Sequence, residues 1–367
     1  MLSSELYSAI VEEEKKGLSE TSLQKAAKNV GATYNVKALK NGLAYLDYNK
    51  PQNRCAYLYK YAVIHTGLVN KFFRKLAKKK VVRNILMRKK DLKIICLGGG
   101  PGTDIVGIFK ALSVFPFMHQ RVSQSSILDL CVGWHNSFNY IMQYLMNGKV
   151  KDVPHTFVRD DFQAYFLEVN LLEPLSPQAA DAIRKADIIC MVKFVSAVLG
   201  NKSSLSALKE IAHLFKIGAV ILFIDNFHSN VSESVQEISK QTGLKIVMGP
   251  EVESFRMVSK SNRSTFGCKP LRDARVTVIG LIKTDLPIKA ISNCLDSDDD
   301  WDTESEESNE KTSKVGHCHK FTQTDMKEVT SVNLEELNEL VNALEDLMSI
   351  VAKFKSRENR CCNCIRP

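Results

Sequence analysis

The sequence predicts an α/β fold with a doubly wound, seven-stranded and mostly parallel sheet. Residues 91–285 alternate short apolar runs typical of buried strands with segments of helical periodicity. A glycine-rich turn directly follows the first of these runs. The last two runs leave no room for a helix between them, so they are expected to form an antiparallel pair that closes a parallel sheet.

Each predicted strand has a counterpart in the apolar pattern. Residues 113–125, between the first two strands, are expected to form an inserted loop. The five parallel strands are expected at residues 93–97, 126–130, 165–171, 187–193 and 219–225, and the closing pair at 244–248 and 275–282.

Residues 1–90 read as a helical region. The longest helix is expected over residues 54–80, where apolar residues and one histidine recur at spacings of three and four. That stripe comprises Leu58, Tyr61, Ala62, His65, Leu68, Val69, Phe72 and Leu76. Residues 71–90 then hold ten Lys and Arg in twenty positions.

The C-terminal part differs in composition. Residues 296–310 hold nine acidic residues and no basic one, so 286–330 is expected to be a disordered acidic linker. Apolar residues spaced by three and four predict a coiled-coil-like helix over residues 331–356, able to form a homodimer through 334–351. The alternative is a helix that packs on its own domain. Residues 357–367 form a Cys-rich tail.

Charge is distributed unevenly along the 367 residues. Residues 291–367 hold 9 Lys and Arg against 17 Asp and Glu, which leaves 41 against 24 in residues 1–290. A basic domain favours a polyanionic partner, RNA above all, although ordinary solubility charge would read the same. No apolar run has the length of a membrane span, and the ten cysteines show no framework spacing. A cytoplasmic or nuclear protein with reduced thiols is expected.

The glycine-rich turn is the strongest functional signal. It contains Gly98, Gly100 and Gly102, and Thr103 stands where a dinucleotide-binding fingerprint needs a third Gly or Ala. The Walker ending Gly-Lys-Ser/Thr is absent. With the strand order, the turn resembles the first motif of class I S-adenosylmethionine-dependent methyltransferases, over about half of the chain. A nicotinamide dehydrogenase is disfavoured.

This resemblance implies S-adenosylmethionine as the cofactor. The glycine turn would wrap its methionine moiety, Asp129 would accept hydrogen bonds from the ribose, and Asn170 and Leu171 would contact the adenine. The alternatives are a helix cap or turn residue for Asp129 and a surface turn before Pro174 for Asn170. Trp134 is a further candidate for contact with a ring, with plain packing as the alternative. The cofactor-binding candidates are therefore Gly98, Gly99, Gly100, Pro101, Gly102, Asp129, Asn170 and Leu171.

The sequence assigns no catalytic residue firmly. The Asp/Asn-Pro-Pro-aromatic motif of amino-methylating enzymes on adenine or cytosine is absent after the fourth strand. Candidates are Lys193, which ends that strand, and the acid–imidazole pair of Asp225, which ends the fifth strand, and His228. The alternatives are a solvated edge charge for Lys193 and surface loop residues for Asp225 and His228. Methyl transfer needs mainly alignment and desolvation. No metal site is expected, because the Cys and His spacings of the tail fit no standard one.

One departure from the family leaves two functions open. The family commonly has an acid two residues before its first glycine, and Cys96 stands there, with Asp104 as a possible substitute. The first hypothesis is a methyltransferase that acts on RNA or protein. The alternative is a catalytically inactive scaffold of the same shape that dimerises and binds partners through its tail.

The tail carries a partner motif. Lys320, Thr322, Gln323 and Thr324 match the Lys-x-Thr-Gln-Thr pattern bound by the dynein light chain of the LC8 type. Such peptides bind by adding a strand to a sheet edge. A dimeric partner would bring two chains together and raise the effective concentration for helix pairing. The alternative is an idle linker.

Overall fold

The computed structural model describes residues 2–33, 46–118, 121–154, 158–199, 204–227, 229–257 and 266–285. The acidic linker, the coiled-coil-like helix, the Cys-rich tail and the light-chain motif Lys320–Thr324 lie outside these ranges, as does His228. No helix within them is long and apolar enough to span a membrane.

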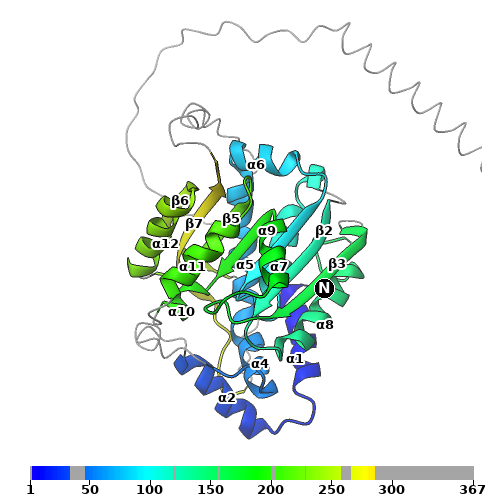
Figure 1. The fold of residues 1–367 in the computed structure, drawn as a ribbon. Coiled ribbons are helices and arrows are strands. Elements are labelled where there is room, and N and C mark those ends of the chain that lie inside the picture. Colours follow the sequence, from blue (N-terminus) through cyan, green and yellow to red (C-terminus); the bar gives the residue numbers. More distant parts are fainter. Residues whose placement is uncertain are drawn as a thin grey trace, which may run out of the picture. The chain divides into compact units, whose positions relative to one another are not determined.

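A single seven-stranded sheet forms the centre, with the strand order β3-β2-β1-β4-β5-β7-β6 (Figure 1). Strands β3, β2, β1, β4 and β5 are parallel, and β7 runs antiparallel to both β5 and β6. The strands are β1 (Leu92–Leu97), β2 (Val122–Asp129), β3 (Val158–Glu168), β4 (Ile188–Val192), β5 (Val220–Asn226), β6 (Leu244–Arg256) and β7 (Asp273–Lys283). The sheet has the seven strands, the mostly parallel direction and the antiparallel closing pair that the sequence predicted, so the predicted fold class is confirmed.

The strand predictions are right in number, order and direction, but several boundaries were wrong, including the start of β3, which begins at Val158 and not at Tyr165. The expected loop over residues 113–125 ends early, because β2 already begins at Val122 beside Leu92 of β1. The polar residues Ser123, Gln124 and Ser125 hid this part of the strand. Strand β3 ends at Glu168, so Asn170 and Leu171 follow the strand. Strand β6 extends to Arg256, well beyond the predicted apolar run.

Helices cover both faces of the sheet, and successive residues of a strand pack against helices on opposite faces. Ile94 and Cys96 of β1 pack with the N-terminal helices, α7 and α8, whereas Ile95 and Leu97 pack with α9, α11 and α12. The helices are α1 (Ser3–Glu14), α2 (Glu20–Thr33), α4 (Pro51–Tyr57), the π-helical turn η1 (Leu58–Ala62), α5 (Val63–Lys78), α6 (Lys80–Met87), α7 (Thr103–Leu112), the 3-10 turn η2 (Pro116–Met118), α8 (Trp134–Met146), α9 (Pro177–Lys185), α10 (Val195–Val198), α11 (Ser204–Leu214) and α12 (Ser229–Thr242).

The N-terminal helices share the core of the sheet. Helices α4 and α5, joined through η1, form the long helix that the apolar stripe predicts. On α5, Phe72 and Phe73 are fully buried, and burial stabilises by about 1.5–3 kcal/mol for each such side chain. Gly107 of α7 allows close packing, since a Cβ there would lie 2.6 Å from Cβ of Val69.

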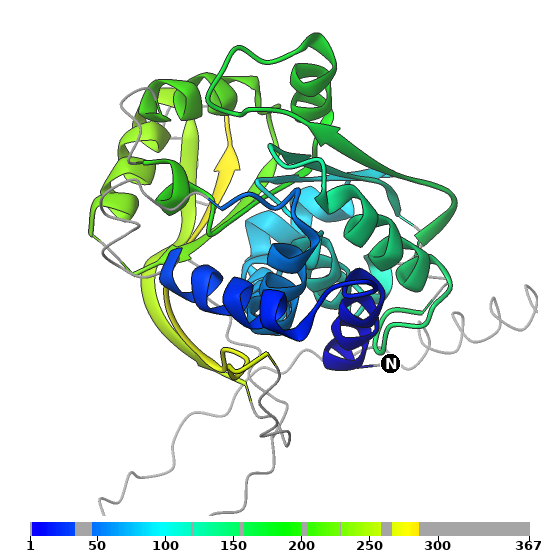
Figure 2. The same cartoon turned by 90° about the horizontal axis from the view of Figure 1, so that it is seen from below.

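The parallel strands all end on one side of the sheet, here called the carboxyl edge, and all begin on the opposite side, the amino edge. The carboxyl ends of the parallel strands face α2 and α4, and Figure 2 looks onto this edge with the N-terminal helices in front. Helix α6 lies at the amino ends, since it directly precedes β1. There Arg121, just before β2, donates to the carbonyl oxygens of Met87 and Lys89. The strand order reverses between β1 and β4, which makes the carboxyl edge at this point the expected ligand site.

Candidate functional site

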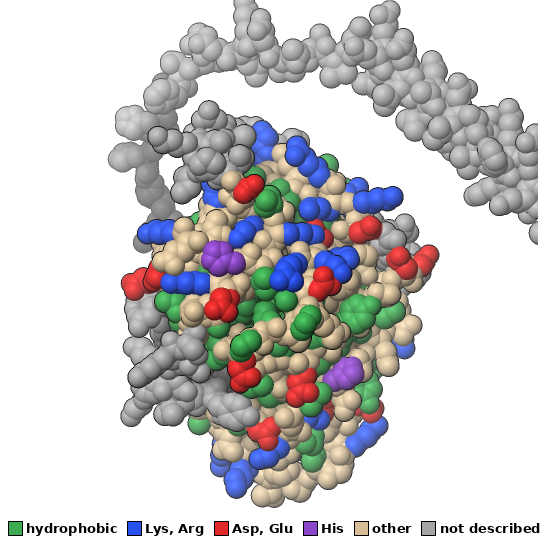
Figure 3. Space-filling model, viewed as in Figure 1, with side chains coloured by type: hydrophobic (Ala, Val, Ile, Leu, Met, Phe, Trp, Pro, Cys, Tyr) green, Lys and Arg blue, Asp and Glu red, His purple; other side chains and the backbone are tan. Residues whose placement is uncertain are grey.

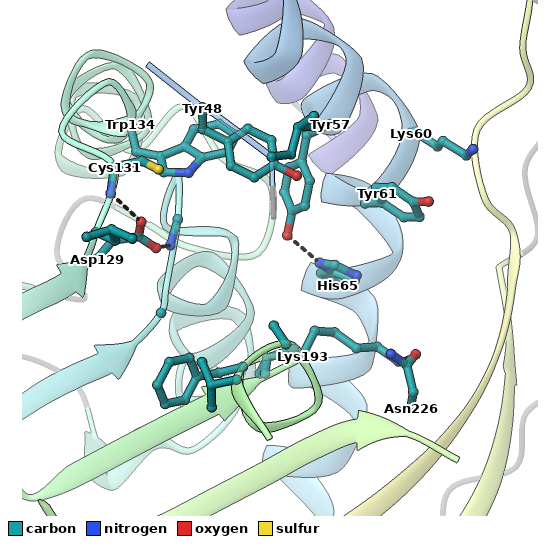
Figure 4. Close-up of a pocket in the computed structure, with 18 of the residues that line it drawn as sticks. Tyr48, Tyr57, Lys60, Tyr61, His65, Asp129, Cys131, Trp134, Lys193 and Asn226 are labelled. Atoms are coloured by element: carbon teal, nitrogen blue, oxygen red, sulfur yellow. Dashed lines mark hydrogen bonds between the residues drawn. The ribbon is translucent and has the colours of Figure 1, made fainter. Parts of the chain in front are cut away.

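A cavity of about 670 Å³ opens at this reversal point (Figure 4). Its floor comes from the residues that follow the strands: Gly98 after β1, Asp129 at the end of β2, Leu171 after β3 and Lys193 after β4. Its roof comes from Tyr48 and from η1 and the flanking turns of α4 and α5. The strand ends and the N-terminal helices therefore build one site together.

The glycine turn adopts a backbone that only glycine accommodates without strain. Gly98 has φ +64° and Gly100 φ +51°, and both line the cavity. A Cβ on Gly98 would lie 2.5 Å from Cδ2 of Phe194. Gly99, Pro101 and Gly102 are not among the residues that line the cavity. A Cβ on Gly102 would meet Phe138, so this glycine serves packing.

Asp129 ties the end of β2 to the glycine turn. Its Oδ2 accepts a hydrogen bond from the Gly100 N–H at 2.9 Å, and its Oδ1 accepts one from the Cys131 N–H at 3.0 Å. Burial raises the pKa of the carboxyl group, and these N–H donors oppose the rise by stabilising the carboxylate. Each oxygen keeps a second lone pair that can accept a ligand hydroxyl at the cavity wall.

Asn170 and Leu171 both line the cavity, as expected, but the Asn170 amide is occupied locally. Its Oδ1 accepts from the Leu172 N–H at 3.1 Å and its Nδ2 donates to Oε1 of Glu173 at 2.8 Å. This is an Asx turn that shapes the loop after β3. Leu171 is 5% exposed and offers the cavity an apolar surface.

Trp134 belongs to an aromatic group that walls the cavity. Its ring lies 4.6 Å from that of Tyr48 and 5.3 Å from that of Tyr57, measured between centroids. Trp134 is 2% exposed. The indole therefore packs against protein rings and also reaches the cavity beside Gly100. Sequence reasoning missed Tyr48 and Tyr57, which precede the apolar stripe.

Tyr57, Tyr61 and His65 follow one another at intervals of four residues along the roof. The Tyr61 and His65 rings are stacked with centroids 5.7 Å apart, and Nδ1 of His65 lies 3.1 Å from the Tyr57 hydroxyl. Burial lowers the pKa of His65 to about 3, so its imidazole is neutral at physiological pH. The stripe did signal Tyr61 and His65, but as core residues. The π-helical turn between Tyr57 and His65 is a feature that often marks functional sites.

Lys193 enters the cavity from the turn after β4. Its Nζ donates to Oδ1 of Asn226 at 2.6 Å, and Figure 4 shows the side chain running along the cavity floor toward that residue. Burial lowers the pKa of Lys193 to about 8. Lys193 is thus a half-buried amine whose uncharged form is more accessible near neutral pH than that of an ordinary lysine.

The structure gives Asp225 a different role from the proposed base. Asp225 is fully buried and is not among the residues that line the cavity. Its Oδ2 accepts from the Ser196 N–H at 2.8 Å and its Oδ1 accepts from the Asn226 N–H at 2.7 Å. Both oxygens accept backbone N–H groups beside the cavity, so this arrangement does not favour the general base proposed for Asp225.

Cys96 and Asp104 both lie away from the cavity. Cys96 is fully buried opposite Cys190 of β4, where an acid would face the apolar core. Asp104 is 3% exposed and accepts a hydrogen bond from the Thr103 hydroxyl at 3.2 Å. Burial raises the pKa of Asp104 to about 7. Neither residue lines the cavity, so the position of Asp104 does not favour its substituting for the missing acid.

Comparison with known proteins finds similar solved structures but no matching family model and no curated relative. A solved structure of a candidate RNA methyltransferase from Pyrococcus horikoshii is similar, with 12% identity over 62% of this chain and 87% of that one and a TM-score of 0.37. Precorrin-6y C5,15-methyltransferase from Geobacter metallireducens has 13% identity over 56% and 87%, with a TM-score of 0.33. With TM-scores this low, the fold rests on the strand order of the sheet itself.

Proposed function

We propose that this protein binds S-adenosylmethionine in the cavity and transfers its methyl group to a bound acceptor. One observation carries this proposal. Gly98 and Gly100 after β1, Asp129 at the end of β2 and Leu171 after β3, which the sequence resemblance implies for this cofactor, line one cavity together with Lys193 after β4. Ligands of open α/β sheets bind at this place in the fold.

The residues fit the cofactor in chemistry as well as in place. The backbone at Gly98 and Gly100 leaves room for the methionine moiety, the Asp129 carboxylate can accept the ribose hydroxyls, and Leu171 offers an apolar contact for the adenine. The cofactor, when bound, supplies an electrophilic methyl group. The chain contributes binding, orientation and exclusion of water by the aromatic roof.

RNA is the acceptor class that the charge distribution supports best. The basic run over residues 71–90 lies along α5 and α6 toward the amino edge, whereas the cavity lies at the carboxyl edge. His65 in the cavity and Lys78 at the end of α5 are about 20 Å apart along the helix. A molecule that contacts both must be long and polyanionic, and an RNA strand meets both conditions. A protein acceptor would need only the cavity.

A second function is supported by Cys96. Because the cavity lacks the usual acid at that position, the fold would also serve as a scaffold without turnover. In that case the tail would carry the activity: a light chain of the LC8 type would bind Lys320–Thr324 and the helix over 334–351 would dimerise. Substitution of Thr322 and Gln323 by Ala would then abolish the cellular function, and substitution of Asp129 would not.

Calorimetry on the full chain with S-adenosylhomocysteine tests the leading function. We expect saturable binding that Asp129→Asn weakens about 10–100-fold, the range expected for losing hydrogen bonds to a charged acceptor. Asp273→Asn is the matched control, since Asp273 lines the same cavity but forms an exposed ion pair with Arg256. Absence of heat at millimolar ligand would contradict the methyltransferase hypothesis and leave the scaffold hypothesis.

A further inference from the structure

Lys193 occupies a backbone position that suits glycine. Its φ is +57°, the left-handed region, which costs a residue with a Cβ about 1–2 kcal/mol. Its N–H donates to the Ile224 carbonyl oxygen at 2.8 Å, which fixes the turn against β5. Strain of this kind clusters at functional sites, where the surrounding structure holds it in place. The turn after β4 thus accepts strain at a residue whose side chain enters the cavity.

The same turn points the side chains of two adjacent residues in different directions. Phe194 lies over the glycine turn, with its ring where a Cβ of Gly98 would be. Lys193 points along the cavity floor to Asn226. Because β1 and β4 are neighbours, Lys193 stands across the reversal point of the sheet from the glycine turn that would hold the cofactor. It therefore faces the space left for an acceptor.

The surroundings of Lys193 favour its uncharged amine form more than water favours that form of an ordinary surface lysine. Burial lowers its pKa to about 8, and the buried carboxylate of Asp225 only partly opposes this. The imidazole of His65, across the cavity, is neutral. The other charged side chains that line the cavity are Lys60, Arg275, Asp129 and Asp273.

We propose that Lys193 is the proton acceptor for the methyl-accepting group, and that this group is an N–H or O–H nucleophile. This inference rests on the proposed function. The acceptor's proton passes to the uncharged Nζ, and the freed electron pair forms the bond to the methyl carbon. The electron pair of the broken carbon–sulfur bond stays on sulfur. One positive charge thus moves from sulfonium to lysine, and the total charge is unchanged.

The proposal has a consequence for ligand binding that needs no acceptor. A sulfonium in the cavity adds a positive charge to those already there and lowers the pKa of Lys193 further. Lys193 therefore releases its proton when S-adenosylmethionine binds below about pH 8. S-adenosylhomocysteine lacks the methyl group and its sulfur is neutral, so it adds no positive charge there and is expected to release no proton from Lys193.

Calorimetry in two buffers of different ionisation enthalpy counts these protons. At about pH 7.5 the full chain is expected to release at least about 0.5 proton more with S-adenosylmethionine than with S-adenosylhomocysteine. Lys193→Met is expected to bind both ligands without that difference. Lys60→Met is the matched control, because Lys60 lines the same cavity and its replacement is expected to leave the difference intact.

A further variant, Lys193→Arg, keeps a charge that cannot be lost and is expected to bind S-adenosylmethionine at least tenfold more weakly than S-adenosylhomocysteine. Equal proton release with both ligands in the unmodified chain would overturn the role of Lys193 while leaving the proposed function intact. A difference that survives in Lys193→Met would overturn it too. Failure of both ligands to bind would remove the proposed function itself.

Discussion

The ionisable side chains at the two edges of the sheet differ in burial and in charge state. At the carboxyl edge, the buried His65 and the half-buried Lys193 both have lowered pKa values, so the cavity favours the uncharged forms of these two groups. At the amino edge, Arg83 and Arg88 are exposed on and beside α6. Figure 3 shows Lys and Arg side chains gathered over the upper half of the molecule, where α6 lies.

This contrast separates binding of a polyanion from chemistry. The net charge of a domain reports on its surface and on association. It gave no information about the cavity, where burial decides the charge state of each group. The basic run and the glycine turn, which the sequence brought into one hypothesis, belong to different edges. The following predictions address the two edges separately, from the largest expected effect to the smallest.

The largest effect is expected from Gly98→Ala. Alanine at this position would have to adopt a strained positive φ, and its Cβ would collide with Phe194. We therefore expect the unfolding free energy to fall by about 2–4 kcal/mol and S-adenosylhomocysteine to bind at least about 100-fold more weakly. Denaturant unfolding and calorimetry measure the two quantities. Gly218→Ala is the control: φ is +76° there, but nothing lies within 4 Å of its Cβ. Equal losses in both variants would show that the Phe194 contact is unimportant.

The next effect concerns acid stability. The folded-state pKa of His65 is about 3, below its ordinary 6.5, so the unfolded chain binds a proton that the folded chain does not. Stability is therefore lost as pH falls below 6.5, by about 2 kcal/mol from this residue at pH 5. His65→Phe is expected to lose that much less stability between pH 7 and pH 5. His213→Phe, at an exposed position on α11, is expected to leave the pH dependence unchanged, and a parallel change there would refute the assignment.

A smaller effect is expected at the amino edge. Charge reversal by Arg83→Glu with Arg88→Glu should weaken RNA binding several-fold and make its salt dependence shallower by about two. Binding of S-adenosylhomocysteine should not change, because the cavity lies at the other edge. The matched control reverses Lys25 and Lys28, exposed on α2. If the control pair weakens RNA binding equally, the amino edge is not the RNA surface.

The smallest effect is expected at Lys75, which pairs with Glu251 and with Glu253 at 3.5 Å on β6. These side chains are partly exposed, so the ion pairs stabilise by at most about 1 kcal/mol. Lys75→Met should shift the unfolding midpoint only slightly and leave ligand binding unchanged. A loss above 2 kcal/mol would mean that this surface network is coupled to the core.

The sequence predicted what depends on local pattern. Alternation of apolar runs and helical segments gave all seven strands, and the spacing of Gly98 and Gly100 gave the position of the site. Residues 122–125 were missed as strand because their polar side chains do not show apolar alternation. Tertiary position decided the rest. The sequence could not show that Asp225 is used by its neighbouring backbone N–H groups.

The roof of the cavity shows the same limit. Tyr61 and His65 were visible as part of a helical stripe, but a stripe that faces a core and one that faces a cavity have the same periodicity. Tyr48 and Trp134 contact each other across 86 positions of sequence, and no local signal joins them. The Lys193 strain was equally hidden, because a positive φ at a lysine has no sequence signature.

The most direct measurement is a crystal structure of the full chain with S-adenosylhomocysteine. It should show the ribose hydroxyls within hydrogen-bond distance of the Asp129 carboxylate, the adenine against Leu171, and the sulfur facing the space between Lys193 and the Tyr61–His65 pair. A cavity that stays empty at saturating ligand, or a ligand bound elsewhere, would contradict the account.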